Sequence, residues 1–94
     1  MGLTTVCIIG STGRDGYEAD FALAESEIRE TGCIPMNPAR SAHGDDVRDT
    51  AREMVMAADM AYLLDGWDES EDARSMARIA MKLGLDIVGG RYGD

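Results

Sequence analysis

Short apolar runs alternate with amphipathic stretches along the chain, and this alternation constrains the fold more than any other feature. Residues 4–10, "TTVCIIG", form a continuous run rich in β-branched side chains that ends in glycine. Such a run is typical of a strand buried on both faces. Similar apolar runs occupy residues 33–38, 60–66 and 85–90. The pattern therefore predicts four buried strands.

Between these runs lie stretches in which apolar side chains recur at helical spacing, at residues 17–32, 45–59 and 68–83. Gly32 and Gly84 stand where a glycine commonly ends a helix. Buried strands that alternate with helices predict a parallel sheet with right-handed crossovers. We therefore expect an α/β fold of β-α-β-α-β-α-β order. It has a four-stranded parallel sheet with helices on both faces, in a reduced Rossmann-like or flavodoxin-like arrangement.

Length and charge limit the function classes. A chain of 94 residues is expected to form a single domain over residues 1–94. It buries only about two-thirds of its unfolded surface, so a partner subunit would enlarge a thin core. The formal net charge of −9 argues against double-stranded nucleic acid as a partner, because Lys and Arg drive that binding. No apolar run approaches the ~20 residues of a membrane span, and the first residues do not resemble a signal peptide. A cytoplasmic location without a membrane partner is expected.

The cysteines and the histidine do not suggest a metal centre. Cys7 and Cys33 lie in apolar segments without a CxxC motif, so free thiols in a reducing compartment are expected. His43 is the single histidine and is expected to be an exposed loop residue rather than a general base. No ligand set surrounds it, so we expect neither a metal site nor a cofactor.

In parallel sheets of this kind, ligands bind beyond the carboxyl ends of the strands, where the strand order reverses. The segments predicted to lie there are residues 10–16, 37–43 and 65–70. In the second segment, Asn37 either binds a ligand or holds the Asn-Pro turn. The ligand site is expected to form from these segments.

The first segment, "GSTGRDG", is a glycine-rich turn before a helix. Its spacing matches neither GxGxxG nor a P-loop. Such a turn exposes backbone N–H groups and suits an anionic or sugar ligand, and the alternative is a flexible turn capped by Asp15. The candidate ligand-binding residues here are Gly10, Ser11, Thr12, Gly13 and Arg14.

The third segment, "DGWDES", is acidic. Asp68 with Glu71 fits a capping box, and Ser70 is an alternative cap that is also a candidate ligand contact. Capping accounts for most of these acids, but it does not require Asp65 or Trp67. Trp67 either stacks on a base or sugar or covers the edge of the core. The acids would repel a phosphate, so any phosphate is expected on the side of the glycine-rich turn.

Taken in order, the chain resembles the nucleoside 2-deoxyribosyltransferase-like family, particularly its short phage and bacterial members. The matching pieces span nearly the whole chain: "IIGSTG", Tyr17, Phe21, Gly32, "NPA" (37–39), "RD" (48–49), "AAD" ending at Asp59, "YLLDGW" (62–67), Ser70, Ala73 and "A-x-x-LGLDIV". The resemblance implies a Rossmann-like domain that recognises a nucleoside or nucleotide and forms homodimers or larger assemblies. It also implies chemistry in which a glutamate attacks the anomeric carbon, the base leaves and a covalent glycosyl-enzyme forms.

The chain departs from the family pattern at the nucleophile. The short relatives read G-W-x-x-S-x-G-A-x-x-E, whereas this chain reads "GWDESEDARSM", with Asp72 at the glycine position and Met76 at the glutamate position. A thioether cannot replace a carboxylate nucleophile. In one alternative, the catalytic carboxylate has moved to Asp72, one turn earlier on the same helix face, or to Asp65. In a second alternative, the pocket binds its nucleotide without turnover. A third alternative is a protein-interaction module that uses the chain's seven methionines.

Overall fold

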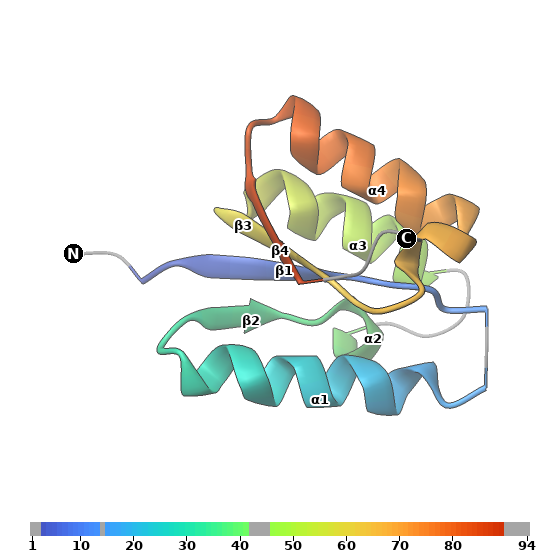
Figure 1. The fold of residues 1–94 in the computed structure, drawn as a ribbon, viewed down its shortest axis with the longest axis horizontal. Coiled ribbons are helices and arrows are strands. Elements are labelled where there is room, and N and C mark those ends of the chain that lie inside the picture. Colours follow the sequence, from blue (N-terminus) through green and yellow to red (C-terminus); the bar gives the residue numbers. More distant parts are fainter. Residues whose placement is uncertain (1–2, 14, 42–45, 90–94) are drawn as a thin grey trace.

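The computed structural model describes residues 3–13, 15–41 and 46–89 and shows a four-stranded sheet (Figure 1). The strands are β1 (Thr5–Ile9), β2 (Ile34–Met36), β3 (Met60–Leu63) and β4 (Asp86–Gly89). Their order is β2-β1-β3-β4, and every neighbouring pair is parallel. The predicted parallel α/β sheet is therefore confirmed.

Helices cover both faces of the sheet. On one face α1 (Tyr17–Glu30) packs on β1 and β2. On the other face α3 (Asp46–Ala57) and α4 (Glu71–Lys82) lie side by side (Figure 1). A separate apolar cluster fills each interface, one around Phe21 and Ile8 and the other around Val55 and Leu63. The alternation of side chains along each strand supplies both clusters.

The structure differs from the prediction after β2. The predicted strand continues to residue 38, but β2 ends at Met36, and Pro38 begins a short helix, α2 (Pro38–Ser41). Proline favours the first position of a helix because its missing N–H would have no helical partner there. The side-chain oxygen of Asn37 accepts a 2.9 Å hydrogen bond from the N–H of Ala39 and so caps this turn.

The structure also decides between the caps considered for two other helices. The N-cap of α1 is Gly16, with φ 80°, and not Asp15. After β3, Gly66 with φ 82° leads into a 3₁₀ turn, η1 (Trp67–Glu69). The hydroxyl of Ser70 then accepts a 3.2 Å hydrogen bond from the N–H of Ala73, so Ser70 caps α4 in place of the capping box. His43 and the predicted tail lie outside the described residues.

The strand order creates a crevice. β1 pairs with β2 on one side and with β3 on the other. The chain therefore crosses from β1 to β2 in one direction along the sheet and from β2 to β3 in the opposite direction. The strand order therefore reverses between β1 and β3, and the loops beyond their carboxyl ends separate there. This is where the sequence predicts a ligand.

Candidate functional site

The crevice beyond β1 holds part of the predicted site. Gly10 and Thr12 follow β1, Arg48 begins α3, and Asp72 and Met76 lie on the first turns of α4. Together with neighbouring apolar side chains, they line a cavity of about 30 Å³. This volume holds a water molecule rather than a nucleoside. Two lining segments border Arg14 and residues 42–45, which lie outside the described residues.

Met76 and Asp72 occupy different depths of this crevice. Met76 is 4% exposed and packs in the core cluster beneath α4, so its thioether lies at the inner end of the crevice. The Asp72 side chain is 55% exposed, and its Oδ1 lies 3.5 Å from Nη1 of Arg48. Asp72 is the one carboxylate among the described residues that line the crevice. The apolar environment of Met76 explains why the core accepts a methionine at this position.

Asp65 and Ser11 line a second hollow, on the α1 face of the sheet. This hollow has a volume of about 220 Å³ and is bounded by α1 and by the end of β3. Within it, the hydroxyl of Tyr62 donates a 3.0 Å hydrogen bond to Oε2 of Glu27. Burial raises the pKa of Tyr62, and the hydrogen bond to Glu27 and the charges of Glu27 and Asp65 raise it further. The two candidate nucleophiles, Asp65 and Asp72, therefore line different cavities.

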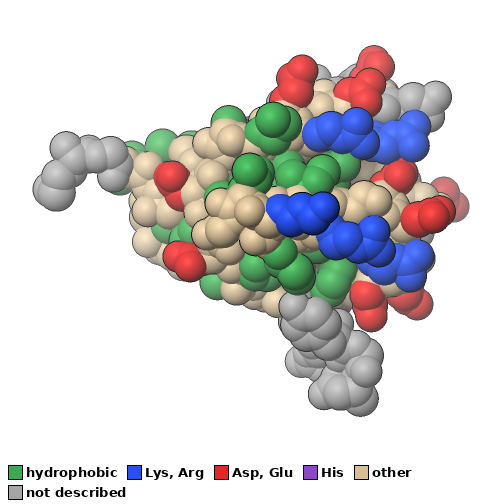
Figure 2. Space-filling view, turned by 90° about the horizontal axis from the view of Figure 1, so that it is seen from above, with side chains coloured by type: hydrophobic (Ala, Val, Ile, Leu, Met, Phe, Trp, Pro, Cys, Tyr) green, Lys and Arg blue, Asp and Glu red, His purple; other side chains and the backbone are tan. Residues whose placement is uncertain are grey.

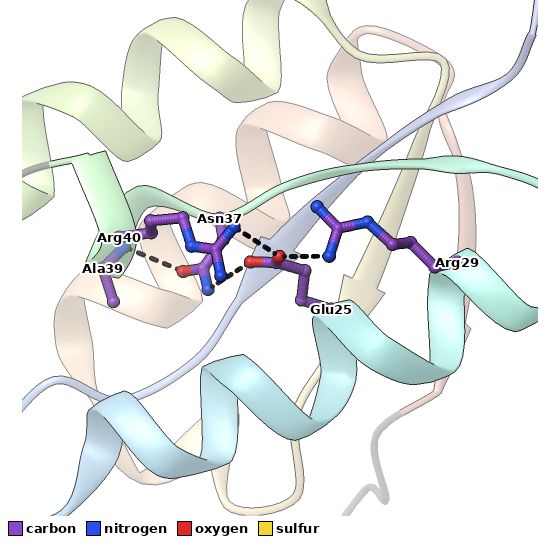
Figure 3. A network of polar contacts seen from close by, with 5 residues as sticks. All are labelled: Glu25, Arg29, Asn37, Ala39 and Arg40. Atoms are coloured by element: carbon purple, nitrogen blue, oxygen red, sulfur yellow. Dashed lines mark hydrogen bonds and ion pairs between the residues drawn. The ribbon is translucent and has the colours of Figure 1, made fainter.

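Asn37 belongs to a buried polar network that lies away from the crevice (Figure 3). Its Nδ2 donates a 3.0 Å hydrogen bond to Oε1 of Glu25, while its Oδ1 caps α2. The other oxygen of Glu25 lies 2.8 Å from Nη1 of Arg29 and 3.0 Å from Nη1 of Arg40. Both polar ends of the Asn37 side chain are thus occupied within the chain. The structure supports the alternative in which Asn37 holds the turn.

The sequence interpretation missed Glu25. This residue is 4% exposed and lies on the inward face of α1, between Phe21 and Ile28. A carboxylate inside an apolar stripe, with Arg29 four residues later, was the available signal. Buried charges in proteins are normally paired, so a carboxylate at this buried position predicts a hydrogen-bonding or cationic partner, although the sequence does not identify it.

The remaining candidate site residues are Trp67, Ser70, Gly13 and Arg14. Trp67 is 6% exposed, packs in the core beneath α4, and lines none of the hollows found within the described residues. It therefore covers the core edge, as one of the two interpretations proposed. Ser70 is the α4 cap, and Gly13 is exposed, with its N–H 3.4 Å from the Ser11 hydroxyl. Arg14 lies outside the described residues.

Among the described residues, no group of three or more His, Cys, Asp or Glu side chains is arranged to hold a metal ion. None of the described helices combines the length and apolar character needed to cross a membrane.

Comparison with known families identifies the domain. The family model described as "Domain of unknown function (DUF4406)" matches residues 6–89. The chain belongs to the DUF4406 family. No curated protein matches the sequence. The DUF4406 match runs from β1 to the end of β4, so the crevice, the second hollow and the Glu25 network all lie within the family domain. The relation to the nucleoside 2-deoxyribosyltransferases stays a prediction.

Proposed function

We propose that the crevice between the carboxyl ends of β1 and β3 binds a nucleoside or nucleotide. The observation that carries this proposal is the convergence of Gly10 and Thr12 with Asp72 and Met76 around one cavity. These residues come from segments far apart in the sequence, and Gly10, Thr12 and Asp72 are among the candidate site residues that the sequence analysis named. They meet where the strand order reverses, which is the usual ligand position in open parallel sheets.

The crevice offers groups that suit the parts of a nucleotide. The turn after β1 supplies backbone N–H groups and the Thr12 hydroxyl, Arg48 supplies a guanidinium for a phosphate, and Asp72 accepts hydrogen bonds from sugar hydroxyls. The Arg48 and Asp72 side chains are 51% and 55% exposed, and their separation of 3.5 Å makes a weak pair. A ligand can therefore replace this pair at small cost. Because a nucleoside is much larger than the described cavity, binding requires these rim side chains to move outward.

We assign binding without turnover as the principal function. Met76 stands at the position where the resemblance expects a nucleophile, and its thioether cannot attack an anomeric carbon. Glycoside hydrolysis usually needs a second carboxylate to protonate the leaving group or activate water. Asp72 has no carboxylate partner among the described residues that line the crevice, since Asp65 lines the other hollow.

One observation favours a second candidate, cleavage of an N-glycosidic bond. Asp72 lines the same crevice as Met76, one helical turn nearer the strand ends. In this reaction a carboxylate oxygen of Asp72 bonds to the anomeric carbon. The carbon–nitrogen bond breaks, and its electron pair leaves with the base, which takes a proton from water. Water then hydrolyses the glycosyl ester.

Calorimetric titration tests the binding proposal, with a panel of deoxynucleosides and their 5′-monophosphates as ligands. Arg48→Met is expected to weaken binding of a monophosphate more than binding of the corresponding nucleoside. Arg52→Met is the matched control, because Arg52 is an exposed arginine one turn farther along α3 and does not line the crevice. If no member of the panel binds to the wild-type protein, the proposal is wrong.

Chromatographic analysis of the same mixtures separates the two candidates. Binding without release of free base supports the principal assignment. Release that disappears in Asp72→Asn, with binding retained, would replace it by the glycosidic reaction.

A further inference from the structure

Basic side chains gather on the outer face of α3 and α4, although the chain is strongly acidic. The chain has nine Lys and Arg residues, and five of them lie on these two helices: Arg48, Arg52, Arg74, Arg78 and Lys82. Figure 2 shows Lys and Arg side chains (blue) in two groups on one half of this face, with hydrophobic side chains (green) between the groups and acidic side chains (red) beside them and at the margins. The same two helices also carry five acidic residues, Asp46, Asp49, Glu53, Glu71 and Asp72, so together they have no net charge, whereas the chain as a whole carries −9.

Most of these cations have no carboxylate partner within the described parts of the chain. Arg48 pairs with Asp72, and Arg74 donates to the backbone oxygen of Asp68 at 3.3 Å. No described carboxylate lies within ion-pair distance of Arg52, Arg78 or Lys82. Four-residue spacing places the α4 cations in one row, where like charges repel unless an anion lies between them.

Exposed methionines accompany the cations. Met56 on α3 is 67% exposed, and Met81 on α4 is 48% exposed. Met56 follows Arg52 by four residues, so the two lie on the same side of α3. Methionine adapts its shape to a partner more readily than branched side chains do. We call this surface the basic face, and it consists of Arg52, Met56, Arg74, Arg78, Met81 and Lys82.

The opposite face of the sheet has complementary chemistry. The 220 Å³ hollow beside α1 is lined by the carboxylates of Asp20, Glu27 and Asp65 and by apolar walls that include Leu23 and Leu64. Leu23 is itself 63% exposed. The raised pKa of Tyr62 in this hollow reflects in part the negative charges of Glu27 and Asp65. We call this cavity the acidic hollow.

We propose that the basic face of one molecule docks on the acidic hollow of a second copy of the same chain. Side chains of the α4 row, Arg74, Arg78 and Lys82, enter the hollow. Their aliphatic stems lie along Leu23 and Leu64, and their charged ends meet the carboxylates of Glu27 and Asp65. Charge complementarity carries this choice of partner, because the same chain supplies both surfaces.

The two surfaces lie on opposite faces of the sheet, so one molecule can use both at once (Figure 1). The contact is therefore heterologous, and repeated copies build a ring or an open chain. This differs from the two-fold dimer, which would bring identical patches together. The difference gives the proposal a direct test.

Sedimentation velocity on the full chain, over a range of concentrations, provides this test. The wild-type protein is expected to form assemblies that grow with concentration. Arg78→Gln with Lys82→Gln removes charges from the basic face without creating a surface complementary to an arginine, and Glu27→Arg blocks the acidic hollow, so each variant alone is expected to be monomeric. An equal mixture of the two variants retains one intact contact per pair and is expected to yield a species of two chains and nothing larger.

Glu18→Arg is the matched control. Glu18 is exposed and lies on the opposite side of α1 from Glu27, so the same charge change there is expected to leave assembly intact. Circular dichroism of each variant verifies folding. A wild-type chain that is monomeric at every concentration overturns the proposal. So does assembly that survives both blocking variants, or a mixture that stays monomeric. If the wild-type chain is monomeric and its basic face binds poly-glutamate, docking between copies is wrong and the partner of that face is a different acidic polypeptide.

Discussion

Nη1 of Arg48 lies 3.5 Å from Oδ1 of Asp72, and this contact joins the start of α3 to the first turn of α4 across the crevice. It is the one ion pair in the described structure that borders the candidate site. Because both side chains are about half exposed, solvent screens the pair, and its contribution to stability is small.

Asp72→Asn therefore separates a functional role from a structural one. The free energy of unfolding is expected to change by less than about 1 kcal/mol, as for other exposed ion pairs. Urea denaturation measures this change. Loss of nucleotide binding in a variant of unchanged stability would assign Asp72 to the ligand. A large loss of stability would instead show that Asp72 holds α3 and α4 together.

Replacement of Glu25 by alanine is expected to have the opposite result. Glu25 is buried, and its removal leaves the Asn37 amide without its acceptor and Arg29 and Arg40 without their anion. We expect a loss of about 2 kcal/mol, which is below the cost of breaking a fully buried pair because both arginines are exposed. Denaturant titration checks this value. Glu30→Ala, at an exposed site on the same helix, is the control and is expected to change stability by less than about 0.5 kcal/mol. Equal effects of the two substitutions would contradict the structural role of the network.

Restoring the family pattern tests whether the crevice still has the frame of an active site. Asp72→Gly combined with Met76→Glu recreates the G-A-x-x-E sequence that the resemblance predicts. We expect this double variant to release free base from a deoxynucleoside that the wild-type protein binds unchanged. The same double variant with Met76→Gln is the control, because an amide cannot act as the nucleophile. A folded variant that binds the nucleoside and releases no base would argue against the resemblance.

The two thiols are expected to differ in reactivity. Cys7 is buried, and burial raises the pKa of its thiol from 9.0 to about 12, whereas Cys33 is half-buried. Only the thiolate reacts, so a thiol reagent at about pH 8 is expected to modify Cys33 in the native protein and both residues after denaturation. Cys33→Ser should leave the native protein unreactive. Equal rates for both thiols would contradict the burial of Cys7.

The same pKa shift predicts the alkaline stability. In the unfolded chain the Cys7 thiol ionises at its ordinary pKa, while in the folded chain it keeps its proton until about pH 12. The unfolded state therefore binds fewer protons between about pH 9 and 12, and the free energy of unfolding falls as pH rises through this window. Cys7→Ala removes this contribution, so its denaturation midpoint should decline less steeply there.

The fold could be predicted from the sequence because each strand is a compact apolar run with a turn signal at its end. The site could be predicted only as a set of strand-end segments. Ser11 and Thr12 are adjacent, yet Ser11 lines the acidic hollow and Thr12 lines the crevice. Successive side chains of an extended segment point to opposite faces, and the sequence alone does not fix which face each takes.

Trp67 and Glu25 show two further limits of sequence interpretation. Trp67 follows a glycine turn, where stacking on a ligand and packing on the core edge give the same pattern, and the core position is found only in three dimensions. Glu25 was overlooked because its partner Asn37 was assigned to the end of the predicted strand, and its partner Arg40 lies in α2, a short helix that was not predicted. The role of Glu25 follows from tertiary contacts, which the periodicity of a single helix does not reveal.

The most direct test of the proposed site is an amide NMR titration of the full chain with the deoxynucleoside and monophosphate panel. We expect the largest shifts at Gly10, Thr12, Arg48 and Ala73, which surround the crevice. Arg48→Met should reduce the shifts caused by monophosphates. Shifts confined to Tyr62 and Asp65 would place the ligand in the acidic hollow, and the absence of shifts with every ligand would contradict nucleotide recognition altogether.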